Sequence, residues 1–264
     1  MDAKYIKFSV SGGTSYCTEY QAVVDAMTTD PVTYGSSYNS FVVSGKSHGW
    51  WDKFDVLYVF CQETNSGGEA LLNWKNPTGD DNCTNNSATF TALEGFTGNG
   101  SSAYLDTNFN PSTEGVNYTL NDASIYVYVR NDVTATAAAV GCQASGYYAG
   151  VWPRNSSNIY ACQLNDTGAS TAGNTATPGL YGADRTASDN IVLSMNGTAM
   201  TTSSISSATI PNANFYIMTR PGSSAYATYQ ISIVAIGGSL TDTIRSNFNT
   251  DCETLMDALG KGVE

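Results

Sequence analysis

Aromatic residues around one expected β-hairpin are the best candidates in this sequence for binding a ligand. Aromatic rings present flat apolar faces that suit the CH groups of sugars, and an arginine beside them can hydrogen-bond hydroxyl groups. The same residue types line subunit interfaces and ordinary cores, so a glycan site, an assembly contact and plain packing all stay open. The candidates are Tyr147, Tyr148, Trp152, Arg154 and Tyr160. Tyr126 and Tyr128, on the non-aliphatic face of another expected strand, are candidates to join them.

Groups for acid–base or nucleophilic catalysis are sparse. Retaining glycoside cleavage needs two carboxyl groups about 5 Å apart, but no Glu-x-Asp-x-Glu run occurs. Asp55 is the lone acid in its expected strand, and Glu94 has no acidic partner beside it. His48 is the only histidine and lies in an irregular Ser-His-Gly-Trp context, not at a nucleophile elbow, the strand-to-helix turn that carries a catalytic serine. We therefore expect a protein that is not an enzyme, with a polysaccharide-cleaving glycoside hydrolase as the weaker alternative.

The charge balance excludes several classes of partner. The chain has 264 residues, with 11 Lys and Arg against 23 Asp and Glu, and a net charge of -12. No basic patch exists to neutralise phosphates, so neither nucleic acid nor an anionic membrane is an expected partner. Only 13% of the residues are charged, against roughly 25% in ordinary globular proteins. Such a surface, rich in Thr, Ser, Asn and Gly, is typical of extracellular or virion β proteins.

Neither a secretory leader nor an apolar run long enough to span a membrane is recognisable, so we expect synthesis and folding in a cytoplasm. Six dispersed cysteines without a CxxC spacing predict buried free thiols. A pairing of Cys142 with Cys162 stays open, on the condition that the two face each other across strands.

The first third of the chain predicts a small α/β segment. A capping box at Thr18 and Gln21 begins a helix over about 18–28, and the apolar run Phe54–Phe60 predicts a strand buried on both faces. The remaining expected elements are an edge strand at 5–10 and a helix at about 37–50. A polar stretch then marks a module boundary: residues 1–88 form an extension that packs on residues 89–264 and shares their core.

The rest of the chain predicts short strands joined by turns. Ile125, Val127 and Val129 alternate with polar or aromatic residues, as in a strand with two different faces. Further strands are expected at 103–105, 124–130, 135–142, 147–152, 159–164, 191–195, 215–219 and 229–237, with a hairpin turn at Asn196-Gly197. Residues 165–189 contain few large aliphatics and predict a long surface loop. Apolar residues from Leu240 to Leu259 recur at helical spacing, which predicts an amphipathic helix with a break near 247–249 as an option.

These motifs together resemble a known family. Phe96-x-Gly98-x-Gly100 before Tyr104-Leu105-Asp106, the strand Ser124–Arg130, the Asn-Gly turn after Ile191, and Ile231–Leu240 are similar in order to concanavalin A-like lectin/glucanase domains of the laminin-G-like branch. The resemblance covers about 90–264. It implies a mainly β protein: an antiparallel jelly-roll β-sandwich with a small α/β N-terminal extension and a C-terminal helix. The preceding segment resembles what comes before such domains in structural proteins of tailed bacteriophages.

The resemblance also implies a ligand and a setting. Laminin-G-like domains often bind calcium through Asp and Asn oxygens, and Asp106, Asn108, Asn121, Asp122 and Asp132 are the matching candidates, although solvated turn residues explain them equally. No cofactor is expected to be required. We expect a virion structural protein (capsid decoration, head fibre or tail-associated) that contacts other virion proteins and further copies of itself, and that can adhere to host-surface polysaccharide. The alternative is a lectin-like host-recognition module.

Overall fold

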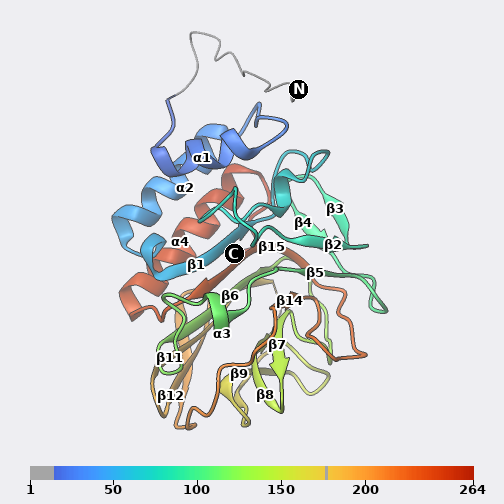
Figure 1. Ribbon diagram of the computed structural model, residues 1–264, viewed down its shortest axis with the longest axis vertical. Helices are drawn as coiled ribbons and strands as arrows, with labels where there is room; N and C mark the ends of the chain where they lie inside the picture. Colours follow the sequence, from blue (N-terminus) through green and yellow to red (C-terminus); the bar gives the residue numbers. More distant parts are fainter. Residues whose placement is uncertain (1–14, 176–177) are drawn as a thin grey trace.

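The protein is a sandwich of two antiparallel sheets with three helices against one outer face (Figure 1). The computed structural model describes residues 15–175 and 178–264, so the strand expected at 5–10 lies outside the described residues. The predicted fold class, a mainly β sandwich with an α/β N-terminal part and a C-terminal helix, is confirmed.

Sheet A has the order β13-β12-β11-β6-β15-β4-β3, and β1 also pairs with β15. Its strands are β1 (Phe54–Val59), β3 (Thr89–Thr91), β4 (Gly95–Thr97), β6 (Ala123–Val129), β11 (Gly179–Ala187), β12 (Asn190–Met195), β13 (Thr198–Ser203) and β15 (Gln230–Gly237). The expected hairpin turn joins β12 to β13, with positive φ at both Asn196 and Gly197.

Sheet B has the order β10-β9-β8-β7-β14-β5-β2. Its strands are β2 (Thr84–Asn86), β5 (Tyr104–Asp106), β7 (Val140–Ala144), β8 (Tyr147–Trp152), β9 (Ile159–Asp166), β10 (Ser170–Gly173) and β14 (Tyr216–Ile217). The predicted hairpin of β8 and β9 is confirmed. The strand expected at 135–142 begins later, at Val140, because residues 135–139 cross from one sheet towards the other without pairing in a ladder.

The main core lies between the two sheets. Alternate residues of β6, namely Ile125, Val127 and Val129, meet inward-facing residues of sheet B such as Val151 and Leu164, all fully buried. The aliphatic face predicted for β6 is therefore the face towards this core, as the two-residue period of a strand requires.

A second core lies on the other face of sheet A, beneath the helices α1 (Thr18–Ala26), α2 (Gly35–His48) and α4 (Asp242–Ala258). Tyr126 and Tyr128 point into it and are at most 1% exposed, so they do not join the aromatic candidates of the hairpin at 147–164. A strand covered by helices on one face and by a sheet on the other reads as amphipathic in sequence but is buried throughout. The single-turn helices η1 (Trp51–Lys53), η2 (Glu69–Leu71) and α3 (Pro111–Glu114) lie in connections.

The segment 165–189 is not the surface loop that its composition predicts. It holds β10 and most of β11, which is flanked by β6 and β12 in sheet A. Arg185 of β11 is fully buried and pairs with Asp166 of β9 across the sandwich at 2.8 Å. On the opposite face, Asp184 pairs with Arg245 of α4 at 3.2 Å. Small residues and paired charges replace the aliphatics here, which is why hydropathy misses the strand.

The C-terminal helix is confirmed and continuous through residues 247–249. Thr241 caps its first turn through the amide of Ile244, and Gly260 follows its end with a φ of 69°, a backbone geometry that suits glycine. The N-terminal residues also enter the sandwich: β1 pairs with β15, and β2 pairs with β5. The boundary at 88/89 stays a prediction.

All six cysteines are free. Cys142 is on β7 and Cys162 is on β9, with β8 between them. Strands two positions apart are separated by about 9.6 Å, beyond the Cα separation that a disulfide bridges. These two thiols therefore do not pair.

Candidate functional site

The outer face of sheet B is the broad sheet surface that the three helices leave open (Figure 1). Along its strands the side chains alternate between the core and this face, as the register of paired strands shows. The half-buried residues on the open face are Tyr104, Asp106, Gln143, Tyr148, Trp152, Gln163 and Tyr216. Aromatic rings and amide groups therefore share one surface.

Two opposed glycines form the floor at the centre of this face. Gly141 of β7 lies directly across from Gly150 of β8. A β-carbon at Gly141 would lie 2.9 Å from Cβ of Arg220, and one at Gly150 would lie 3.1 Å from the ring of Trp152. Because neither position has a side chain, the Arg220 stem and the indole ring can lie close against the sheet.

Arg220 connects the aromatic residues above this floor. Its Nε donates a 2.6 Å hydrogen bond to Oε1 of Gln143. Its guanidinium carbon lies 5.4 Å from the ring centre of Tyr148 and 5.8 Å from that of Trp152, both within cation–π range. We call Gln143, Tyr148, Trp152 and Arg220 the platform.

A tyrosine cluster continues the open face on the far side of the platform. Tyr216 of β14 is opposite Gly141 and stacks on Tyr104 of β5, with ring centres 4.8 Å apart; Tyr226 lies 6.2 Å from Tyr104. Burial, the nearby Asp106 and Tyr104 raise the pKa of Tyr216, so its hydroxyl is a hydrogen-bonding group at neutral pH. The strands from β5 to β9 span roughly 19 Å, from four inter-strand spacings of about 4.8 Å.

A hollow of about 320 Å³ borders the platform on its other side. Trp152 forms one wall, and Gln163, Asn155, Thr136 and small alanines form the rest. An apolar ring wall with convergent amide and hydroxyl groups is the usual make-up of a small-ligand site.

The structure separates the five aromatic-set residues predicted from sequence. Tyr148 and Trp152 lie together on the open face, whereas Tyr147 is on the other side of the same strand, at its start. Tyr160 is fully buried between the sheets, with its hydroxyl bonded to the carbonyl of Gly182 at 2.7 Å. Tyr160 is therefore a core residue, because it has the parity of inward-facing Cys162 and Leu164. Arg154 pairs with Asp132 at 2.6 Å and donates to the carbonyl of Thr175.

The five calcium candidates do not come together in one place. Asp122 precedes β6 and Asp132 follows it, so the seven residues of that strand hold them roughly 23 Å apart. Asp106 accepts from the amides of Asn108 and Asn214, and Asp122 accepts from the Ser239 amide. Asn121 accepts from Ser207. Within the described residues, no group of three His, Cys, Asp or Glu side chains could hold a metal ion.

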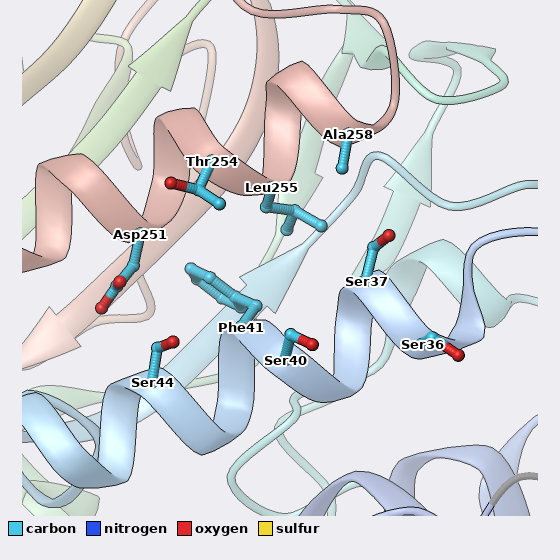
Figure 2. Close-up of a pocket in the computed structure, with 9 residues that line it drawn as sticks. All are labelled: Ser36, Ser37, Ser40, Phe41, Ser44, Asp251, Thr254, Leu255 and Ala258. Atoms are coloured by element: carbon cyan, nitrogen blue, oxygen red, sulfur yellow. The ribbon is translucent and has the colours of Figure 1, made fainter.

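His48 has a partner that the sequence does not reveal. Its Nδ1 lies 2.7 Å from Oδ2 of Asp251 on α4, and Nε1 of Trp50 donates to the same oxygen at 2.7 Å. Asp251 also borders a groove of about 300 Å³ between α2 and α4, which Ser37, Ser40 and Ser44 of α2 also line (Figure 2). In the part of the chain that the structure describes, no serine hydroxyl is hydrogen-bonded to His48, and the contact ties α2 to α4.

Sequence reasoning missed Arg220, Gln143, Tyr104 and Tyr216. Each comes from a different strand or connection, and the paired glycines that seat the platform look like ordinary turn glycines in one dimension. Of the open-face aromatic residues, only Tyr148 and Trp152 were named from sequence, because both lie on the strand expected at 147–152.

No protein-family model matches the chain, and no curated protein matches its sequence. Solved structures share its fold. A Trypanosoma rangeli sialidase in complex with sialic acid aligns with a TM-score of 0.55 at 13% identity, over 83% of this chain. Domain 4 of a GH43 extracellular arabinanase from Geobacillus stearothermophilus, in complex with arabinotriose, aligns with a TM-score of 0.52 at 12% identity, over 74% of this chain and 98% of the domain.

The chain spans only 39% of the sialidase chain that it matches. At these identities the likeness shows a shared β-sandwich fold. Within the described residues, no helix is both long enough and apolar enough to cross a membrane.

Proposed function

We propose that this protein binds carbohydrate, without cleaving it, through the open face of sheet B. The observation that carries the proposal is the platform, in which the side chains of Tyr148, Trp152 and Arg220 lie close against the sheet at Gly141 and Gly150. The platform borders the hollow of about 320 Å³ that Trp152 lines. Flat aromatic faces accept the apolar faces of sugar rings, while Gln143, Gln163 and Asn155 offer donors and acceptors for hydroxyl groups. The length of the face suits an extended chain of sugars.

The structural neighbours add support to this proposal, although it rests on the platform. One structure that shares the fold of this chain is domain 4 of the arabinanase, which was determined in complex with arabinotriose. The open sheet is also the surface on which a sandwich can offer a wide, rigid site, since its strands fix the spacing of the side chains.

A binding assay with matched variants tests the proposal. A glycan array followed by calorimetry should give binding by the wild type, and Trp152→Ala should weaken it about thirtyfold or more, as for a central interface anchor. Tyr34→Ala removes a half-buried tyrosine on the helix side and should change nothing. Full binding by Trp152→Ala, or no binding of any glycan by the wild type, would refute the proposal.

The assay also separates the two other interpretations of these aromatics. If they form an assembly contact, Trp152→Ala shifts the oligomeric mass in light scattering and leaves glycan affinity intact. If the protein is a hydrolase, reducing ends accumulate from a bound polysaccharide and Glu→Gln changes abolish that release.

For the setting, we propose a structural protein of a tailed-phage virion, in the capsid decoration, head fibre or tail, present as a homo-oligomer among other virion proteins. Support comes from the resemblance of the segment before residue 90 to what precedes such domains in phage structural proteins, and from the low charged fraction of 13%. Mass spectrometry of purified virions tests it: absence of the chain from the particles would contradict the setting and leave the glycan site untouched.

A further inference from the structure

Arg220 is the exception among the arginines of this chain. Arg130 pairs with Glu94, Arg154 with Asp132, Arg185 with Asp166 and Arg245 with Asp184. Acidic residues outnumber basic ones 23 to 11, so a carboxylate partner is easy to supply. Nevertheless, no carboxylate of the described residues lies within ion-pair distance of Arg220.

The guanidinium of Arg220 is held in place with its outer edge unused. Oε1 of Gln143 accepts a hydrogen bond from Nε of Arg220 at 2.6 Å. Within residues 15–175 and 178–264, neither Nη atom of Arg220 donates a hydrogen bond. Two aromatic rings and the Gly141 floor restrict the side chain further. An arginine fixed in this way keeps its planar pair of Nη donors free, the arrangement that matches a carboxylate bidentately.

The position of this free edge relates it to the sugar site. Arg220 lies against Trp152, and Trp152 is a wall of the hollow that Gln163 and Asn155 also line. A sugar ring seated at Trp152 therefore has Arg220 beside it on one side and amide groups on the other. A carboxylate attached to that ring lies within reach of the guanidinium without entering the core.

We propose that the glycan bound by the open face carries a carboxylate, as in a uronic acid or another acidic sugar, and that Arg220 recognises it. This inference rests on the proposed glycan binding. With a net charge of -12 the protein does not attract a polyanion from a distance. Recognition instead comes from one oriented pairing of the half-buried Arg220 guanidinium with a carboxylate. The acidic groups of the polymer must therefore be spaced along it.

Matched polysaccharides test the proposal: an acidic polymer that the wild type binds, and the same polymer after chemical reduction of its carboxyl groups to alcohols. The wild type should bind the acidic form about tenfold to a hundredfold more tightly, the range for hydrogen bonds to a charged group. Arg220→Gln should lose this preference and bind both forms like the reduced one. Arg220→Lys keeps the charge without the planar fork and should recover only part of it.

Lys46→Gln is the control for net charge, since it removes the same charge from an exposed helix position paired with Glu19, and its preference should equal that of the wild type. Equal affinity of the wild type for both polymers overturns the carboxylate inference and leaves glycan binding standing. If Lys46→Gln also loses the preference for the acidic polymer, the inference is overturned, because the net charge of the protein then explains the selectivity. If a sulfated polymer binds equally tightly, the Nη donors of Arg220 recognise anions in general, and the carboxylate assignment is overturned. Absence of binding to every polymer overturns the proposed function itself.

Discussion

Replacing Arg185 by methionine tests whether segment 165–189 is a buried part of the sandwich or the surface loop that its composition suggests. Arg185 is fully buried, and its guanidinium donates to Asp166 at 2.8 Å, to the Leu164 carbonyl at 2.6 Å and to the Ile205 carbonyl at 2.9 Å. These contacts join β11 of sheet A to β9 of sheet B and to the connection after β13. Methionine fills similar space but donates to none of them.

The expected cost follows from what is left behind. Asp166 is 1% exposed, so without Arg185 its carboxylate is a buried charge without a counter-ion. Breaking a buried pair in this way costs about 3–5 kcal/mol. For a chain of this size each kcal/mol lowers Tm by about 2–4 °C, which predicts a fall of roughly 6–20 °C.

Urea unfolding and thermal scans measure this directly. Arg185→Met should lower the midpoint with an unchanged m-value, and the double variant Arg185→Met with Asp166→Leu should recover most of the loss, because an apolar pair can replace a buried ion pair at little cost. Lys46→Ala removes an exposed pair and should cost less than about 1 kcal/mol. If Arg185→Met also costs less than about 1 kcal/mol, or if the double variant is no better than the single one, the buried placement of this strand is wrong.

Three further predictions concern pH, the core and calcium. Burial raises the pKa of Asp184 to about 6, above its unfolded value of about 3.9; its contribution to stability is therefore fully present below about pH 4 and declines by about 3 kcal/mol as pH rises through 6. The difference in unfolding free energy between wild type and Asp184→Asn should show this decline, and a flat difference from pH 4 to 7 would contradict the raised pKa. Tyr160→Phe should lower the unfolding free energy by about 1 kcal/mol, for one buried hydrogen bond, without affecting glycan affinity; a large loss of affinity would return Tyr160 to the site. Because the five calcium candidates are dispersed, calcium or EDTA should shift Tm by less than about 1 °C, and a shift of several degrees would reveal an assembled site.

The fold class was accessible from sequence because it depends on local periodicity. Period-two alternation over Ser124–Arg130 and the hairpin signal at Asn196-Gly197 place strands correctly, and the helical spacing from Leu240 to Leu259 places α4. These patterns reflect which side of one element is apolar. They do not say which second layer covers it, which is why Tyr126 and Tyr128 were candidates for the aromatic set and lie in the core beneath the helices instead.

The sequence did not predict strand β11 for a different reason. Its residues Gly182, Ala183, Asp184 and Arg185 carry little hydrophobic signal, and their burial is possible only because Tyr126, Arg245 and Asp166 meet them from other elements. A buried charge is stable only when its partner is in place, and a partner 19 or more residues away cannot be recognised from the sequence.

What the sequence alone determined is therefore the list of elements: a mainly β chain, strands at their approximate positions, a terminal helix, and an aromatic hairpin that includes Tyr148 and Trp152. What only the tertiary structure decided is which surface is open and what gathers there. Arg220 reaches Trp152 across 68 residues of sequence because β7 and β8 pair with two glycines opposed, leaving room for both side chains against the sheet. That juxtaposition depends on strand register, and register is set by the packing of the whole sandwich.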